Sequence, residues 1–303
     1  MEDLVNKLTW SFSRREMFKS CRRRSYYHYY LSWGGWDDFA SRSARLAYRL
    51  KKIQSVDAYV GSEVHDQISG IIGYLSVGKQ IEPDETGMLR RLDRAFESSR
   101  ANRWYQDLKR YPKFWDDYYG KGISVEREEE IKQKAITCLR EFIASPMYAR
   151  LVQYADQIEW LWIDNPLAKS IPTFTVDGFE AYSKLDLAIR SAEKVYIFDF
   201  KTGKPTDTEA DQILSYSLFA LDRWDIKPET INTQVISLHP KFTARAYPVT
   251  IESLNRVSDL IKTSYAQMQS LVDKNNSAKE DDFPKADNDN SCRWCNFIEL
   301  CRR

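Results

Sequence analysis

Five cysteines and a short Asp-x-Lys sequence are the residues of this chain whose types and spacing can do chemistry. Three of the cysteines, Cys292, Cys295 and Cys301, form C-x2-C-x5-C near one end, and Cys21 lies near the other. Three thiolates are one ligand short of the four that an iron–sulfur cluster or a structural zinc takes. Cys21 can supply the fourth only if the two ends of the chain meet, and Cys138 is then a bystander.

A second group of residues indicates a divalent metal site. Asp186 lies in a predicted strand, and Asp199 and Lys201 lie at the end of the next strand, VYIFDF over 195–200. Side chains alternate along a strand, so Asp199 and Lys201 share a face, and a turn at 191–194 brings Asp186 beside them. Two carboxylates at one point repel each other unless a cation lies between them, and oxygen ligands suit Mg²⁺ or Mn²⁺. A lysine there can orient water and stabilise charge that develops on a phosphate.

Three further residues are candidates for the same site. His65 lies on a helix predicted over 56–74 and can be a third metal ligand, although a single histidine on a helix also fits a core position. Gln212 and Tyr216 are four residues apart on a helix predicted over 206–222, so they share one face. Gln212 can hold the strand end, the water or a phosphate, and Tyr216 can hydrogen-bond a nucleic-acid backbone.

The composition limits the class of protein. The chain has 303 residues, of which 43% are hydrophobic and 29% are charged, and its net charge of +1 gives no global basic signature. No stretch approaches 18 apolar residues, and the first residues lack the apolar core of a signal peptide. We therefore expect a cytoplasmic protein with no membrane contact. In that reducing compartment, five cysteines indicate metal ligands rather than disulfides.

Positive charge is concentrated around Cys21. Six basic residues fall within eleven positions and four tyrosines follow at once: Arg14, Arg15, Lys19, Arg22, Arg23, Arg24, Tyr26, Tyr27, Tyr29 and Tyr30. Basic groups neutralise phosphates, and aromatic faces can stack on bases. The same residues also fit a solvated helix face with a tyrosine stripe in the core, and the sequence leaves both interpretations open.

The elements that must position these residues follow a simple order. The predicted helices span 11–31, with Ser11 or Ser13 as N-cap, 56–74, most of 82–147, 206–222 and 251–273. The predicted strands span 157–163, 179–190, 195–200, 233–239 and 244–250, and a polar linker is predicted over 275–290. This order favours one α/β core with a helical insertion over two independent domains.

The motifs together resemble a known family. GSEVH at 61–65, SKLDLAI at 183–189, IFDFKTG at 197–203 and DQILSYSLFAL at 211–221 resemble the RecB-like branch of the PD-(D/E)XK nuclease superfamily. The split cysteines resemble the members of that branch that carry a 4Fe–4S cluster, the CRISPR-associated RecB-like exonucleases and the AddB-type nuclease domains. The resemblance extends from Cys21 to Cys301, although no motif falls within 75–155.

The resemblance implies a role for each candidate residue. It assigns metal binding to His65, Asp186, Asp199 and the main-chain carbonyl of Phe200. Lys201 would be the catalytic lysine, and Gln212 with Tyr216 matches the trailing Q-x3-Y motif. Lys184 departs from the pattern, because a small residue often stands two positions before the aspartate. Asp199 is a common variant of the glutamate at the second acidic position, so we expect an active enzyme.

The resemblance also implies the architecture. We expect a restriction-endonuclease-like α/β fold with a central mixed sheet, and an iron–sulfur clasp that joins the two ends of the chain. One nuclease domain would span 1–303, with cluster-binding segments at 1–31 and 275–303, a helical insertion at 75–155 and a nuclease core at 156–274.

The sequence therefore predicts a Mg²⁺- or Mn²⁺-dependent deoxyribonuclease, an exonuclease on DNA ends or single strands, that hydrolyses phosphodiester bonds. One alternative is a weakly active or inactive DNA-binding subunit of a larger repair or antiviral defence complex, and another is zinc in place of 4Fe–4S. DNA is the expected partner. The chain has no G-x4-G-K-[ST] motif, so a helicase or the proteins of CRISPR adaptation are candidate partners rather than parts of it.

Overall fold

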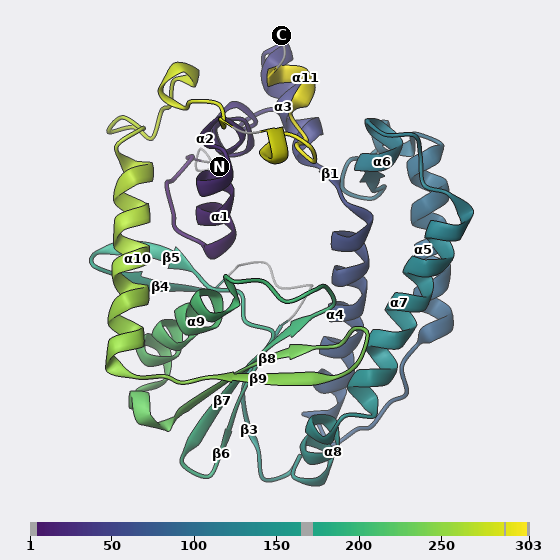
Figure 1. The fold of residues 1–303 in the computed structure, drawn as a ribbon, viewed down its shortest axis with the longest axis vertical. Helices are drawn as coiled ribbons and strands as arrows, with labels where there is room; N and C mark the ends of the chain where they lie inside the picture. The colour runs from purple at the N-terminus through teal and green to yellow at the C-terminus, as the bar shows by residue number, and fades with distance from the viewer. Residues whose placement is uncertain (1–4, 165–171, 288, 302–303) are drawn as a thin grey trace.

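A five-stranded sheet forms the centre of the molecule (Figure 1). The computed structural model describes residues 5–164, 172–287 and 289–301. Its strands have the order β3-β6-β7-β8-β9, with the bounds Glu159–Ile163, Leu187–Ser191, Lys194–Lys201, Ile231–Ser237 and Thr243–Tyr247. Only β7 and β8 are parallel neighbours, and the other three pairs are antiparallel. This is the mixed sheet of an α/β fold that the sequence predicts.

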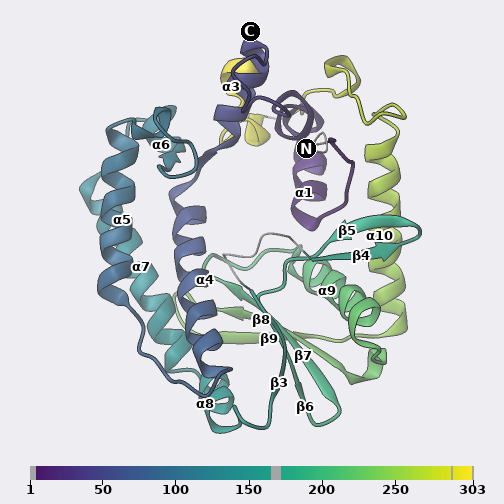
Figure 2. The same cartoon turned by 180° about the vertical axis from the view of Figure 1, so that it is seen from behind.

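Helices cover both faces of this sheet (Figures 1 and 2). Side chains of Leu187 and Phe198 share one buried cluster with α4 (Val56–Leu75), α5 (Glu85–Arg100), α7 (Val125–Ile143) and α8 (Pro146–Gln153). Side chains of Ala188 and Ile197 point the other way and pack with α9 (Glu209–Trp224) and α10 (Ile251–Gln269). The alternation of side chains along β6 and β7 thus divides the core into two layers.

The parallel pair of strands requires a crossover connection. A parallel neighbour cannot follow a tight turn, so the chain leaves β7, forms α9 and returns to begin β8. The predicted caps of this helix, Thr206 and Asp207, were wrong. Thr208 is at the N-cap without a side-chain hydrogen bond, and Glu209 instead accepts a hydrogen bond from the backbone N–H of Thr206.

The single helix predicted over 11–31 was wrong, because the chain breaks it at Cys21. Ser11 caps α1 (Phe12–Ser20) as predicted, but Cys21 has an extended backbone with φ of −164°. The Cys21 sulfur then accepts a hydrogen bond from the N–H of Arg24 and acts as the N-cap of α2 (Arg22–Tyr26). A π-helical turn over Tyr27–Leu31 follows, and then α3 (Arg42–Lys51).

The strand predicted over 179–190 was also wrong, because it is two strands in different sheets. β5 (Phe179–Tyr182) pairs with β4 (Thr173–Val176), and its other edge exchanges backbone hydrogen bonds with Trp10. Those partners draw β5 away from the large sheet, so the chain bends over 183–186 before β6 begins. Trp10 is fully buried, which fixes the N-terminal segment against β5.

The segment predicted as a linker, 275–290, packs against the molecule over its described residues. Phe283 is 1% exposed, and its ring lies 5.5 Å from the rings of both Tyr26 and Tyr30. The Arg23 guanidinium donates to the carbonyl of Phe283. Within this mostly polar segment, Phe283 is the apolar residue that holds the C-terminal part of the chain against α2.

The remaining elements are short. They are β1 (Ile53–Gln54), β2 (Lys113–Phe114), α6 (Trp115–Tyr118) and α11 (Ile298–Cys301), with 3-10 turns at Arg103–Tyr105, Pro228–Thr230, Glu280–Asp282 and Asp289–Ser291. No helix in the described part of the chain is long and apolar enough to cross a membrane.

Candidate active site

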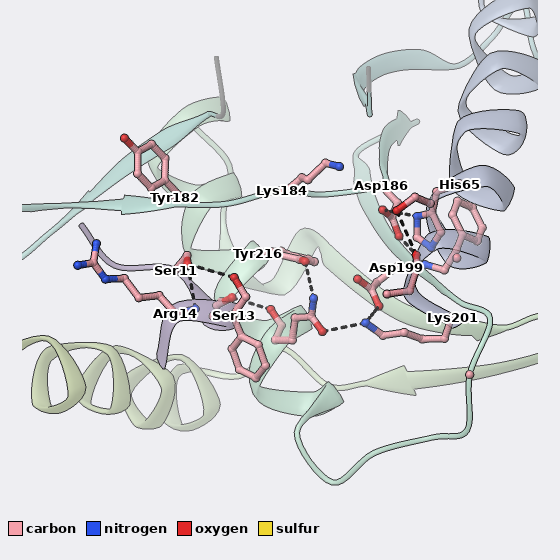
Figure 3. Close-up of a pocket in the computed structure, with 18 of the residues that line it drawn as sticks. Ser11, Ser13, Arg14, His65, Tyr182, Lys184, Asp186, Asp199, Lys201 and Tyr216 are labelled. Carbon is pink, nitrogen blue, oxygen red and sulfur yellow. Dashed lines mark hydrogen bonds and ion pairs between the residues drawn. The ribbon is translucent and has the colours of Figure 1, made fainter. Parts of the chain in front are cut away.

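A cavity of about 720 Å³ lies where α1, α4, α9 and the ends of β5 and β7 meet (Figure 3). The residues that line it belong to six segments: 9–14 before and in α1, Tyr29 in the π-helical turn, 58–66 in α4, 182–186 before β6, 199–203 at the end of β7, and 212–216 in α9. Six residues singled out from the sequence line it together: His65, Asp186, Asp199, Lys201, Gln212 and Tyr216. Their proximity is established, while their roles in catalysis stay predictions.

One side of the site is a histidine–carboxylate pair. His65 Nδ1 lies 3.0 Å from Asp186 Oδ1, and the backbone N–H of Phe200 donates to Asp186 Oδ2 at 2.7 Å. Burial disfavours a protonated imidazole, but the Asp186 carboxylate outweighs it and raises the pKa of His65 to about 9. Burial also opposes the charge on Asp186, yet His65 and the Phe200 N–H hold the pKa of that carboxyl below its usual value.

The other side is a carboxylate, a lysine and two supporting residues. Lys201 Nζ lies 2.8 Å from Asp199 Oδ2 and donates to Gln212 Oε1 at 2.8 Å. Gln212 in turn donates from Nε2 to the hydroxyl of Tyr216 at 2.8 Å, so α9 fixes the lysine in one orientation (Figure 3). Burial, and next the charge of Asp186, raise the pKa of Asp199 to about 6.

The geometry of the strands explains why these groups meet. Asp186 directly precedes β6, and Leu187 is paired with Phe198, so Asp186 comes opposite Asp199. The main-chain carbonyl of Phe200 remains a predicted ligand. The contact that Phe200 makes in the site is the hydrogen bond from its backbone N–H to Asp186. Asp199 and Lys201 lie on one face of β7, as the period of two requires.

The donor set fits a divalent cation. Two buried carboxylates repel each other, and Asp199 Oδ2 has no hydrogen-bond partner of good geometry besides its ionic contact with Lys201. Oxygen ligands with one imidazole suit Mg²⁺ or Mn²⁺. Among the residues that the structure describes, no three His, Cys, Asp or Glu side chains form a metal-ligating group. His65 and Lys201 instead lie against the carboxylates as their counter-charges.

Sequence reasoning missed a second ion pair at the edge of the cavity. Lys184 Nζ lies 3.1 Å from the carboxylate of Asp164, which is 7% exposed and directly follows β3. The backbone N–H of Asp164 donates to the carbonyl of Asp186 at 2.9 Å. Lys184, noted only as a departure from the family pattern, therefore has a buried partner. The sequence signal for this ion pair was Asp164, an aspartate at the end of the predicted strand 157–163.

Arg14 is the other residue whose position the sequence did not indicate. It lines the cavity and is 4% exposed, and its guanidinium donates to the hydroxyls of Thr9 and Tyr30 at 3.4 and 3.1 Å. Among the other predicted basic residues, Arg23 binds Glu280 and the carbonyl of Phe283. Arg23 therefore joins two segments of the protein, a role that neither interpretation of the basic residues included.

The cysteines near the two ends of the chain lie close together. α2, which begins after Cys21, and α11, which ends at Cys301, lie at the same end of the molecule (Figure 1). Burial raises the pKa of the Cys295 and Cys301 thiols, and the nearby Cys21 raises both further. Cys292 acts on Cys301 in the same direction. Backbone N–H groups donate to the sulfurs of Cys21 and Cys295, each at 3.4 Å.

Cys138 lies elsewhere, and its role as a bystander stays a prediction. It is fully buried in α7 among the residues that pack on the sheet, and burial raises the pKa of its thiol to about 11. All five cysteines are free thiols in the structure.

Comparison with known proteins supports the sequence motifs. The family model of the PD-(D/E)XK nuclease superfamily matches residues 9–302. No curated protein matches the chain. One similar solved structure, described as "Crystal structure of SSO0001", shares 10% identity and a TM-score of 0.31, over 70% of this chain and 84% of that one. That likeness is too weak to carry an argument, whereas the family model spans nearly the whole sequence. The chain belongs to the PD-(D/E)XK nuclease superfamily.

Proposed function

We propose that this protein is a Mg²⁺- or Mn²⁺-dependent deoxyribonuclease of the RecB-like branch, acting as an exonuclease on DNA ends or single strands. The observation that carries the proposal is the convergence of Asp186, Asp199, His65 and Lys201 on one cavity. Members of this superfamily typically use divalent metals to hydrolyse phosphodiester bonds, and all four groups that such a reaction needs are present here.

Each side chain has a separate task in this proposal. Asp186, Asp199 and His65 would hold the metal, which supplies charge stabilisation at the phosphate and a more acidic water. The Phe200 N–H fixes one oxygen of Asp186 and so orients that carboxylate. Lys201 presents its ammonium where negative charge develops on the phosphate, and Gln212 holds it there without reorganisation during the reaction.

The shape of the cavity favours a single strand as substrate. Residues 9–14 and Tyr29 line the same cavity as the carboxylates, so the site is bounded by the N-terminal segment as well as by the sheet. A flexible strand can enter such a bounded space more easily than a rigid duplex. If the free end of a strand is the part that reaches the carboxylates, the enzyme would cut from that end, which is exonuclease action.

We further propose that Cys21, Cys292, Cys295 and Cys301 bind a 4Fe–4S cluster, with zinc as the alternative. The charges of these cysteines act on one another, and hydrogen bonds to sulfur are among the interactions that tune such a cluster. Among the described residues no three of these side chains form a group that could hold a metal ion, so the choice of 4Fe–4S over zinc rests on the family resemblance.

The proposal is tested by anaerobic purification followed by digestion of end-labelled DNA with Mg²⁺ or Mn²⁺. Asp199→Ala should abolish cleavage and retain the melting temperature, because it removes a metal ligand from a site on the surface of the cavity. Asp222→Ala, an exposed change on α9, is the matched control and should cut normally. Wild-type cleavage by Asp199→Ala would refute the site. Tight DNA binding without cleavage by the intact protein would favour the DNA-binding subunit instead.

A further inference from the structure

A line of alternating cationic and aromatic side chains begins in the cavity. The guanidinium of Arg14 lies 4.1 Å from the ring centre of Tyr29, and both residues line the cavity. Lys51, the last residue of α3, places its Nζ 5.6 Å from the same ring. The side chains that bound the catalytic site are therefore continuous with α3, outside the cavity.

The line continues along α3 to an exposed pair of tryptophans. Lys52 Nζ lies 5.3 Å from the ring of Tyr48, and Tyr48 meets the edge of Trp36 at 5.9 Å. Trp36 in turn meets Trp33 at 5.2 Å. Trp33 and Trp36 are 39% and 48% exposed, although tryptophan is usually largely buried. We call Tyr29, Lys51, Lys52, Tyr48, Trp36 and Trp33 the α3 track.

The cations of the α3 track, and Arg14 beside it, have no acidic partner among the residues that the structure describes. No carboxylate in the described ranges forms an ion pair with Arg14, Lys51 or Lys52, although the structure holds many ion pairs elsewhere. Burial, and next the charges of Lys52 and Arg14, lower the pKa of Lys51 to about 8. Like charges held together without counter-ions are unfavourable unless an anionic ligand neutralises them.

The acidic residues nearest in sequence do not supply that neutralisation. Asp37 and Asp38 lie in the exposed loop between Trp36 and α3, and the Asp37 carboxylate accepts a hydrogen bond from the N–H of Phe39. Neither carboxylate forms an ion pair with a described lysine or arginine. The positive charge of the α3 track is thus available to a ligand.

We propose that the α3 track is a binding site for single-stranded DNA that leads to or from the catalytic cavity. Phosphates would lie against Lys51 and Lys52, and bases would stack on Trp33 and Trp36. This inference rests on the proposed nuclease function. Exposed tryptophans alone also suit a protein partner. Unpaired cations between aromatic rings, joined to the cavity, favour a polynucleotide, because both backbone and bases then have partners.

Binding of a fluorescein-labelled dT30 oligonucleotide in EDTA, measured by anisotropy, tests the α3 track without cleavage. The double variant Lys51→Ala/Lys52→Ala should lower the slope of log K against log salt by about 1.4, since each neutralised phosphate of a single strand contributes about 0.7. Trp36→Ala should weaken binding about tenfold through lost stacking. The matched controls, Lys79→Ala/Lys194→Ala and Tyr154→Ala, change exposed residues of other elements and should bind as the wild type does.

Two results would overturn the α3 track. One is that Lys51→Ala/Lys52→Ala or Trp36→Ala binds dT30 with the affinity of the wild type. The exposed tryptophans would then be assigned to a protein partner. The other is a 30-base-pair duplex that binds as tightly as dT30 and is equally sensitive to Trp36→Ala, because paired bases cannot stack on the indole.

Cleavage separates this inference from the proposed function. With Mn²⁺, both variants should reduce the preference of the enzyme for dT30 over dT6, because the longer strand has more nucleotides outside the cavity to contact the α3 track. If the wild type cuts neither oligonucleotide but binds dT30 through Lys51 and Lys52, the nuclease proposal fails and the α3 track stands. If it cuts both with an unchanged preference in the variants, the α3 track fails and the nuclease stands.

Discussion

Two histidines report opposite electrostatic environments in two regions of the molecule. At the sheet, His65 lies against Asp186, which outweighs the effect of burial and raises the pKa of His65 to about 9. Beside the cysteines, burial and the surrounding lysines and arginines lower the pKa of His28 to about 3. The environment of His65 favours a bound cation, and the environment of His28 favours a bound anion.

The contrast extends to the groups around each histidine. The carboxylates of the cavity carry their own counter-charges, His65 and Lys201, so that site is preformed in the protein alone. The cysteine end has cations instead: burial raises the pKa of Cys295 and Cys301, and the charges of Arg24 and Lys285 partly offset that rise. Cationic surroundings suit a group of thiolates and a DNA backbone alike. Removal of a metal should therefore affect the two regions differently.

Lys201→Ala should give a large effect on the carboxylate side, second only to Asp199→Ala. A preorganised charge that acts on the transition state is worth about 10²–10³ in rate, and we expect that loss in kcat for DNA cleavage. Mn²⁺ affinity should be retained or improved, because the ammonium now competes with the metal for Asp199. Single-turnover cleavage and calorimetric Mn²⁺ titration measure the two quantities. Lost Mn²⁺ affinity with preserved turnover would contradict this role.

Cys21→Ser should give the largest effect on the cationic side. If Cys21 is the fourth ligand, the variant should lose the absorbance near about 400 nm of an iron–sulfur chromophore and melt at a lower temperature, since cluster binding contributes to folding. Cys138→Ser is the control and should keep the chromophore, because Cys138 is buried in another core. EDTA, by contrast, should leave the melting temperature of the wild type nearly unchanged. Full iron content in Cys21→Ser would show that Cys21 is not the fourth ligand.

The two regions also differ in how far the sequence predicts them. Asp199 and Lys201 lie on β7, and Asp186 directly precedes β6, the antiparallel neighbour that a tight turn joins to β7, so local pairing is enough to place them together. The contact between Cys21 and the C-terminal cysteines was inferred from ligand number, and the structure brings those segments together. The break at Cys21 was missed, because a sulfur as N-cap has no strong sequence signal. Phe283 was missed because its partners, Tyr26 and Tyr30, are about 250 residues away.

His65→Ala should have a moderate effect that identifies the role of this histidine. If His65 is a metal ligand, the variant should bind Mn²⁺ more weakly and cut more slowly at limiting Mn²⁺, with much of the rate restored at saturation. Its melting temperature should change little, because the His65 side chain is 25% exposed and faces the cavity. A large fall in melting temperature with unchanged Mn²⁺ affinity would make His65 a structural residue.

His28 should produce the smallest effect, and it is visible only in the pH dependence of stability. His28 is half-buried between Tyr29, at 4.6 Å, and Phe297, at 6.3 Å. Burial, and next the charge of Lys51, lower its pKa to about 3, below the 6.5 of an unfolded chain. The folded state therefore binds the proton less tightly than the unfolded state. Its full stability is present above pH 6.5 and is lost as pH falls from there toward 3.

His28→Gln removes this titration while it keeps a polar side chain of similar size. The melting temperature of the variant should fall less steeply than that of the wild type between pH 6.5 and 4, and the two should run parallel above pH 7. The same comparison in the presence of dT30 links the histidine to the cations of the α3 track, because a bound polyanion would favour protonated His28 and reduce the difference. Identical pH profiles for variant and wild type would mean that the cations around His28 are already neutralised, and the electrostatic contrast with His65 would disappear.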